Sequence, residues 1–265
     1  MSESTVSAEL IAPQLEDRTK QSVTPLSYRT IRRDYQSHEA MPDVMVDSYA
    51  QLISPLLTRL FVKAGTTPNQ VTVCMMISGV VGAALFAVPQ VFCKVLGLVF
   101  MHLWYVLDCS DGEVARITRQ FSKFGTEMDY IAHVVNHPLF NLAFAYGLIC
   151  MGRYNSSLIL WASLLCISAE LVIRNLIGFQ YMYKLKMVAG INRSGKRGVL
   201  KGAAAVLVNL FSIYPNFALA FPLVYLVDIY FGTSIAMYYL LIHASVSTLM
   251  ATRASYRRIR STINT

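Results

Sequence analysis

Long apolar runs separated by short polar connectors fill most of the chain after residue 66. The runs lie at about residues 67–88, 91–116, 125–150, 157–181, 200–227 and 231–250. Each reaches about 20 residues, the length with which a helix crosses roughly 30 Å of hydrocarbon. The pattern therefore predicts an all-α integral membrane protein with six transmembrane helices.

A shorter periodic segment, residues 42–66, precedes these runs. Its apolar residues recur at spacings of three and four, which places them on one face of a helix. This periodicity predicts an amphipathic helix lying in the membrane interface, although a helix packed on the transmembrane bundle would show the same pattern. Ser54 and Pro55 are typical of a cap followed by a first-turn proline, so we expect the helix to be interrupted there.

The polar ends complete the predicted domain organisation. Residues 1–41 are polar and mixed in charge, so we expect a flexible cytoplasmic tail without a cleavable signal peptide. Residues 67–252 form the transmembrane domain, and residues 253–265 form a basic cytoplasmic tail. Composition agrees with a membrane protein, because 55% of the 265 residues are hydrophobic and only 14% are charged, against about a quarter charged in soluble domains.

Basic residues are unevenly distributed among the connectors, and this distribution predicts the orientation. The connectors after the second and fourth runs and the C-terminal segment are rich in Lys and Arg, whereas the opposite connectors hold Lys94, Arg153 and little else. By the positive-inside rule, the basic side with both termini is cytoplasmic. A bacterial inner membrane is the simplest location.

Acidic residues gather in one stretch at this cytoplasmic side. Five of the seven Asp and Glu residues after residue 66 lie within DCSDGEVARITRQFSKFGTEMD, from Asp108 to Asp129. Asp108 and Asp111 share one helical face, as do Asp129 and His133 on the next helix, and the short connector brings both pairs together. Carboxylates at a membrane boundary need a positive partner, either a hard divalent cation such as Mg²⁺ or the basic residues of the connector.

The spacing of this stretch is similar to D-x2-D-G-x2-A-R-x8-G-x3-D-x3-D, the signature of the CDP-alcohol phosphotransferases, membrane enzymes of phospholipid head-group synthesis. The chain matches this signature at Asp108, Asp111, Gly112, Ala115, Arg116, Gly125 and Asp129. The segment TPNQVT, with Pro68, Asn69 and Thr72, resembles the family's entry to its first helix. The resemblance covers roughly residues 44–255.

The resemblance implies a reaction and a set of site residues. A phosphate-linked group would pass from a CDP-activated donor, expected to be lipid-linked, to the hydroxyl of a small acceptor, with release of CMP. Asp108, Asp111 and Asp129 would hold one or two Mg²⁺ or Mn²⁺ ions that bind the donor diphosphate. The positions implied for the CDP site are Asn69, Gly112, Ala115, Arg116 and Gly125. Membrane lipids and a second copy of the chain, as a homodimer, are the other expected partners.

The chain departs from the signature at its last position, where His133 replaces the aspartate that serves the family as proposed general base. His133 can itself be the base, because an imidazole titrates near neutral pH. It can instead be a nitrogen ligand that favours Mn²⁺, or mark a lost or altered activity, or simply pack. His137, one turn further, can contact His133 or the acceptor.

Two further features are candidates for the acceptor side. Glu170 and Arg174 form an i, i+4 pair inside an apolar run, so Arg174 either lines the acceptor pocket or makes a structural salt bridge. The connector INRSGKRG can bind a phosphorylated acceptor or anionic lipid head groups. Its basic residues are Arg193, Lys196 and Arg197. It is short and has no aromatic platform, so we do not expect nucleic acid as a partner.

Three other functions remain open at this stage. The same chemistry can act on a specialised cell-envelope substrate, or the protein can be a catalytically weak membrane protein that binds CDP and metal. A transporter is the weakest alternative, because the acids lie at the membrane boundary rather than near its midplane.

Overall fold

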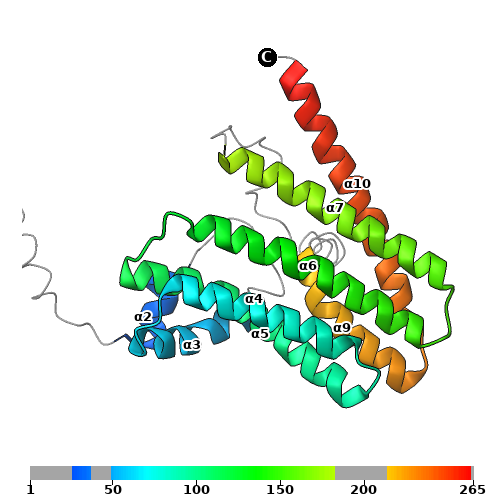
Figure 1. Ribbon diagram of the computed structural model, residues 1–265, viewed down its shortest axis with the longest axis horizontal. Coiled ribbons are helices and arrows are strands. Elements are labelled where there is room, and N and C mark those ends of the chain that lie inside the picture. Colours follow the sequence, from blue (N-terminus) through cyan, green and yellow to red (C-terminus); the bar gives the residue numbers. More distant parts are fainter. Residues whose placement is uncertain (1–25, 37–48, 183–213, 264–265) are drawn as a thin grey trace, which may run out of the picture.

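The computed structural model describes residues 26–36, 49–182 and 214–263, and these residues form helices and short connectors without a strand (Figure 1). The helices are α2 (Tyr28–Thr30), η1 (Ile31–Tyr35), α3 (Gln51–Lys63), α4 (Pro68–Ala87), α5 (Val91–Thr118), α6 (Gly125–Cys150), α7 (Ser156–Met182), α9 (Tyr214–Phe231) and α10 (Ile235–Ile263). The all-α prediction is confirmed for this part of the chain.

Within the described residues, four helices are long and apolar enough to cross a membrane. They are α4, α5, α7 and α10. The fold thus supports an integral membrane protein, but the predicted count of six spans is not confirmed. Helix α6 has 26 residues, yet its inward face carries many polar side chains, and the predicted span at 200–227 begins outside the described residues.

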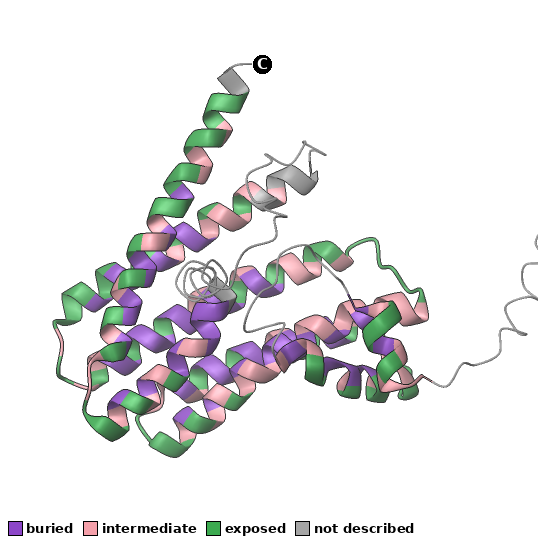
Figure 2. Cartoon of the chain, turned by 180° about the vertical axis from the view of Figure 1, so that it is seen from behind, coloured by how far each residue is buried: buried purple, intermediate pink, exposed green. Residues whose placement is uncertain are grey.

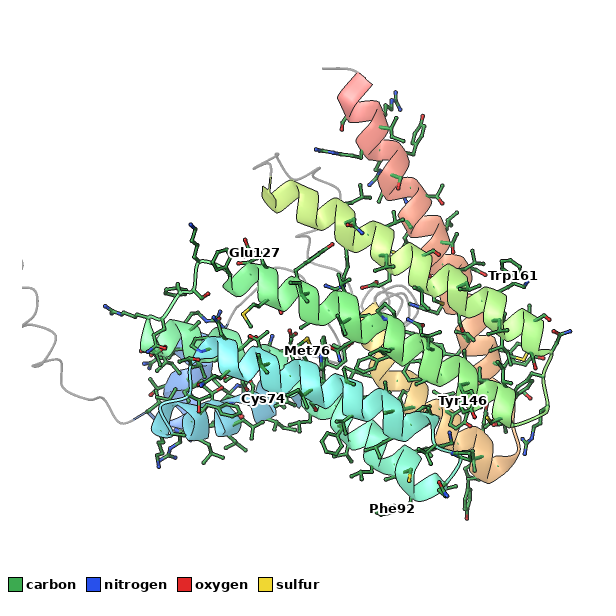
Figure 3. The ribbon with its side chains drawn as sticks, viewed as in Figure 1. Cys74, Met76, Phe92, Glu127, Tyr146 and Trp161 are labelled. Atoms are coloured by element: carbon green, nitrogen blue, oxygen red, sulfur yellow. The ribbon has the colours of Figure 1, made fainter. Side chains whose placement is uncertain are left out.

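The outer surface of the bundle is apolar, and its mainly apolar interior also holds polar side chains. Large apolar side chains such as Phe92, Trp161 and Leu249 are exposed, whereas His133, Asn136 and other polar groups are buried. Figure 2 shows the buried residues where the helices face one another and the exposed residues on their outer sides. Figure 3 shows Phe92 and Trp161 on the outside of their helices. An apolar exterior is the surface that lipid tails can solvate, and buried polar side chains in such a bundle usually serve a function.

Helices α4 and α5 approach each other closely because glycines line their contact. A Cβ atom added to Gly97 would lie 2.6 Å from the backbone nitrogen of Phe86 and 2.8 Å from the carbonyl oxygen of Gly82. Small residues permit such backbone contact between membrane helices. Helix α4 also packs on α6, and α7 packs on α10, whose C-terminal half projects away from the other helices (Figure 1).

Helix α3 lies against α5 with its polar residues inward. Ser54 and Thr58 are fully buried, while Leu56 and Leu60 are more than half exposed. The expected interruption at Ser54 and Pro55 is wrong, because α3 is continuous from Gln51 to Lys63. Pro55 is the fifth residue of this helix, so its missing backbone N–H removes one helical hydrogen bond, the one to the Gln51 carbonyl.

Part of the predicted flexible tail is folded. Proline at position 55 leaves the Gln51 carbonyl without its helical N–H, and the side-chain amide of Gln36 donates to that carbonyl instead. The Tyr28 hydroxyl donates to the Leu52 carbonyl at 2.9 Å, and Ile31 is fully buried. Residues 26–36 therefore dock on α3, a contact that their polar composition did not predict.

The predicted basic tail also differs from the expectation in form. Helix α10 continues without a break to Ile263, so residues 253–263 are helical rather than a separate tail. Its start is fixed by Asp228, whose carboxylate accepts hydrogen bonds from the backbone N–H groups of Ile235 and Ala236 at 2.9 and 2.7 Å. A carboxylate at this position satisfies N–H groups that have no partner within the helix.

Candidate active site

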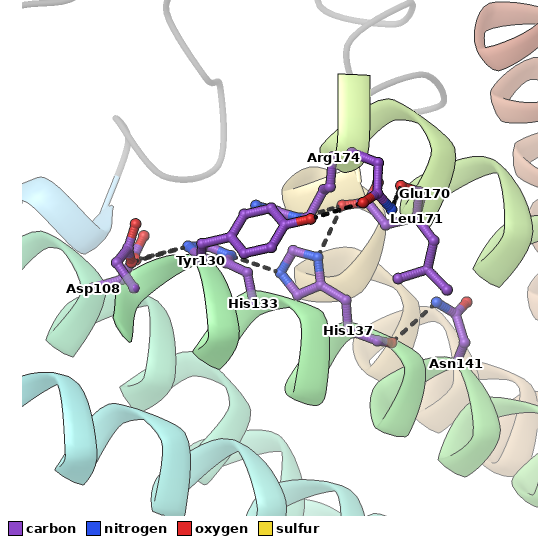
Figure 4. A network of polar contacts seen from close by, with 10 residues as sticks. Asp108, Tyr130, His133, His137, Asn141, Glu170, Leu171 and Arg174 are labelled. Carbon is purple, nitrogen blue, oxygen red and sulfur yellow. Dashed lines mark hydrogen bonds and ion pairs between the residues drawn. The ribbon is translucent and has the colours of Figure 1, made fainter. Parts of the chain in front are cut away.

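The candidate site lies where the last three turns of α5 face the first turns of α6 (Figure 4). Arg119 ends α5 in the left-handed conformation, with a φ of 55°, which turns the chain out of the helix. A connector of six residues, 119–124, then leads into α6, which returns in the opposite direction. Helix α4 packs on both α5 and α6, and side chains of α5 and α6 meet at the candidate site. The motif residues therefore face one another as the sequence predicted.

Asp108, Asp129 and His133 form a compact cluster of potential metal ligands. The His133 Nε2 atom lies 3.1 Å from Asp108 Oδ1 and 3.4 Å from Asp129 Oδ1. One donor atom from each of the three residues lies within 4.8 Å of the others. Two ligands of one octahedral Mg²⁺, each about 2.1 Å from it, are roughly 3 Å apart when adjacent. The three donors thus fit the ligand set of a small divalent cation.

Asp111 is close to this cluster but is engaged by a different helix. Its Oδ2 atom accepts a hydrogen bond of 2.7 Å from the Thr72 hydroxyl on α4. Thr72 belongs to the TPNQVT segment, so this contact joins the two stretches that resemble the family. The structure therefore groups Asp108, Asp129 and His133 together, with Asp111 held beside them.

A chain of polar contacts runs from this cluster to α7 (Figure 4). His133 Nδ1 lies 3.1 Å from His137 Nε2, and His137 Nδ1 lies 3.0 Å from Glu170 Oε1. Arg174 Nε donates to the same Glu170 oxygen at 2.7 Å. Both histidines and Glu170 are buried. The Glu170–Arg174 salt bridge that the sequence allowed is present, and it reaches the candidate metal ligands through two imidazoles.

Trp104 on α5 holds both imidazoles in place. Its indole ring meets His133 edge-on, with centroids 4.8 Å apart at 88°, and meets His137 with centroids 5.4 Å apart. Edge-to-face contacts of this kind favour one ring orientation. The sequence analysis did not identify Trp104, although it lies one turn before Asp108 on the same helix.

The positions implied for the CDP site lie around the same end of the bundle. A Cβ atom added to Gly125 would be 3.8 Å from Asn69 Oδ1, so the starts of α4 and α6 are adjacent there. The guanidinium of Arg116 approaches Gly112, and its Nε donates to the Tyr35 carbonyl. Ala115 is half-buried. The connector residues Arg193, Lys196 and Arg197 lie outside the described residues.

Glu113 is a buried residue of the motif whose role the sequence did not reveal. Its Oε1 atom accepts hydrogen bonds from Ser54 at 2.6 Å and from Gln36 at 2.9 Å, and its Oε2 atom accepts one from Thr58 at 2.6 Å. Glu113 therefore ties α3 and the 26–36 segment to the helix that carries Asp108. One feature of the sequence could have indicated this role: Ser54 and Thr58 are spaced i, i+4, so their hydroxyls share one face of α3 and can bind the same carboxylate.

Comparison with known proteins agrees with this geometry. A family model described as CDP-alcohol phosphatidyltransferase matches residues 65–251, a range that contains the candidate metal ligands and the whole motif. A search of curated proteins found no match. The match covers more than half of the chain, so the chain belongs to the CDP-alcohol phosphatidyltransferase family and has the all-helical, apolar build of an integral membrane protein.

Proposed function

We propose that the protein transfers a phosphatidyl-type group from a CDP-alcohol to the hydroxyl of a small acceptor and releases CMP, in phospholipid or related head-group synthesis. The observation that carries this proposal is the Asp108, Asp129 and His133 cluster, located within the family match. In the transfer, the acceptor oxygen forms a bond to the β-phosphorus of the donor, the phosphorus–oxygen bond to CMP breaks, and the hydroxyl proton is released.

The proposed cofactor is Mg²⁺ or Mn²⁺. Asp108, Asp129 and His133 are the proposed ligands of one ion, and Asp111 is the proposed contributor to a second. When bound, such ions neutralise and orient the donor diphosphate. A nitrogen ligand in place of a carboxylate removes one negative charge and favours Mn²⁺ over Mg²⁺.

The geometry favours His133 as a metal ligand over the general-base role. A base needs a free lone pair directed toward the acceptor hydroxyl. Here, Nδ1 of His133 faces His137, and Nε2 faces the carboxylates of Asp108 and Asp129. Both ring nitrogens are therefore directed at protein groups, and Nε2 is directed at the proposed cation position.

We place the CDP moiety beside Asn69, Gly112, Ala115, Arg116 and Gly125. The structure supports this proposal because Asn69 and Gly125 are adjacent and a Cβ atom at Gly125 would meet no atom closer than 3.6 Å. Space beside a glycine lets a ligand lie against the backbone. The buried His137 and the paired Arg174 do not support an acceptor contact for these two side chains, so the acceptor side is proposed to include Arg193, Lys196 and Arg197.

Location and assembly follow as further parts of the proposal. The site lies at the end of α5 beside the basic connector at 119–124, and the positive-inside rule puts this end in the cytoplasm. We therefore propose a cytoplasmic active site and cytoplasmic termini, in a bacterial inner membrane. A homodimer surrounded by membrane lipids is the proposed assembly.

The test is release of CMP by the purified protein with CDP-diacylglycerol, Mn²⁺ or Mg²⁺ and a panel of hydroxylated acceptors. We expect CMP release to depend on the metal, to be lost in Asp129→Asn and to be retained in Glu127→Gln. Glu127 is the matched control because it is an exposed acid on the same helix. CDP binding without release for any acceptor would favour the binding-only alternative, and release with a different CDP-alcohol would favour the specialised substrate.

A further inference from the structure

Glu170 is the most distant member of the polar chain that leads to the metal ligands. It lies on α7, whereas Asp108 is on α5 and the two histidines are on α6. Its Oε1 atom receives hydrogen bonds from both sides, from Arg174 Nε at 2.7 Å and from the His137 ring at 3.0 Å. Figure 4 shows His137 between His133 and this carboxylate.

The direction of each hydrogen bond in this chain follows from the chemistry of its two ends. A carboxylate paired with a guanidinium only accepts hydrogen bonds, so His137 must donate its Nδ1–H to Glu170. A neutral imidazole carries one N–H, which leaves a lone pair on His137 Nε2. That lone pair accepts from His133, so His133 carries its proton on Nδ1.

In a neutral His133 the lone pair is consequently on Nε2. This atom lies 3.1 Å from Asp108 Oδ1 and 3.4 Å from Asp129 Oδ1, and both oxygens are acceptors as well. Without a metal ion, a proton on Nε2 can donate to Asp108, which is the hydrogen bond that the 3.1 Å contact describes. A divalent cation in place of that proton would bring the Nε2 lone pair and the two carboxylate oxygens to one positive charge. The geometry thus prepares Nε2 to share a cation with the two carboxylates.

We propose that Glu170 is a positioning residue which, through His137, holds His133 in the tautomer whose Nε2 lone pair binds the same divalent cation as Asp108 and Asp129. This proposal rests on the proposed function. It extends that function because it gives α7 a role in orienting a metal ligand, although none of the three candidate ligands among the described residues is on α7. A group that hydrogen-bonds directly to a ligating histidine raises its basicity and fixes its orientation, and loss of such a group typically weakens metal binding about 10- to 100-fold. Here His137 is the direct partner of His133, and Glu170 acts through it.

The sequence spacing alone could not assign this role. Glu170 and Arg174 form an ordinary i, i+4 pair, which would equally well stabilise α7 by itself. The second link appears only because α6 and α7 pack together and place the His137 ring against the carboxylate. Trp104 restricts both rings from the side of α5, so neither imidazole can turn without disturbing the core.

The experiment compares two variants of similar size in the full-length protein. Glu170→Gln retains an acceptor oxygen, whereas Glu170→Met retains the volume and removes the acceptor. Binding of Mn²⁺ alone is measured by the loss of the free-ion electron paramagnetic resonance signal. We expect Glu170→Met to weaken Mn²⁺ binding about 10-fold, the lower end of the range for a direct partner of the ligand, Glu170→Gln to weaken it less, and Glu127→Gln to leave it unchanged.

A second measurement on the wild-type protein keeps the proposal testable if Glu170→Met does not fold. The ring nitrogens of ¹⁵N-labelled histidines are observed in the Mg²⁺-loaded protein, with His133→Ala used to assign the signals. The expected pattern is a protonated Nδ1 and an unprotonated Nε2 for His133; the reverse pattern would overturn the proposal.

The outcomes also separate this inference from the proposed function. Wild-type protein that releases CMP and binds Mn²⁺, together with a folded Glu170→Met variant of equal Mn²⁺ affinity, would overturn only the role of Glu170. Absence of Mn²⁺ and Mg²⁺ binding in the wild-type protein would overturn the inference and the metal-dependent function together.

Discussion

Replacing Gly125 by alanine separates the requirements of the fold from those of the proposed CDP site. Gly125 is the first residue of α6 and belongs to the family signature. A Cβ atom there would lie 3.6 Å from the Ser122 side chain and 3.8 Å from Asn69 Oδ1, which are ordinary van der Waals contacts. Packing in the ligand-free protein therefore does not require a glycine at this position.

The expected effects on stability and binding have different signs. Alanine in place of glycine within a helix stabilises it by up to about 1 kcal/mol, so the folded state should be as stable as in the wild type or slightly more stable. The added methyl group would occupy space proposed for the donor. We expect the Kd for CDP to rise at least about tenfold, which corresponds to roughly 1.4 kcal/mol.

Gly97→Ala supplies the contrasting control. Its Cβ atom would lie 2.6 Å from the Phe86 backbone nitrogen, so α4 and α5 must separate. Overpacking of this kind costs about 1–3 kcal/mol or more. We expect the midpoint of thermal unfolding in detergent to fall for Gly97→Ala and to stay at or slightly above the wild-type value for Gly125→Ala.

Calorimetric CDP titration and thermal unfolding of both variants provide the assay. Wild-type affinity for CDP in a correctly folded Gly125→Ala protein would refute the placement of the nucleotide. A large loss of stability in Gly125→Ala would instead contradict the open space that the structure shows beside this residue.

Three other predictions test hydrogen bonds outside the candidate metal site. Gln36→Ala removes the side-chain donor to both the Gln51 carbonyl and Glu113, and should speed hydrogen exchange in the 26–36 segment, at a local cost of about 1 kcal/mol for each hydrogen bond; unchanged exchange would show that this amide does not hold the segment. Thr58→Val leaves one oxygen of Glu113 without its hydroxyl donor, and should lower the free energy of unfolding by about 1.5–3 kcal/mol. Asp228→Ala removes the cap of α10 and should cost about 0.5–2 kcal/mol in thermal unfolding. CMP release should stay at the wild-type level, because this end of α9 lies beside the C-terminal part of α6, where Tyr225 donates to the Gly147 carbonyl, whereas the candidate metal ligands are at the start of α6.

The sequence predicted the centre of the site because all of its members are local in the chain. Spacings of three and four placed Asp108 with Asp111 and Asp129 with His133, and the short connector predicted that the two pairs meet. The partners of these residues are not local. Thr72 reaches Asp111 from α4, and Glu170 reaches His137 from α7, and no spacing within one helix predicts which helices pack together.

The fold was predictable to a similar degree and for a related reason. Apolar runs predict helix positions well, because a helix that crosses the hydrocarbon core must be about 20 residues long and largely apolar. The docking of residues 26–36 was missed because these residues are polar and because the cause lies elsewhere, in the carbonyl that Pro55 leaves unpaired. The buried hydroxyls of α3 follow from Glu113, a partner 55 residues away from Thr58.

The most direct test of the central claim is a single reaction in which CMP and the lipid product are both quantified. Purified protein, CDP-diacylglycerol, Mn²⁺ and the best acceptor of the panel are combined, and both products are measured by mass spectrometry. Transfer predicts one molecule of new phospholipid for each CMP, and neither product in Asp108→Asn. CMP without a new phospholipid would indicate hydrolysis. Product amounts in Asp108→Asn that equal those of the wild-type protein would contradict the proposed metal site.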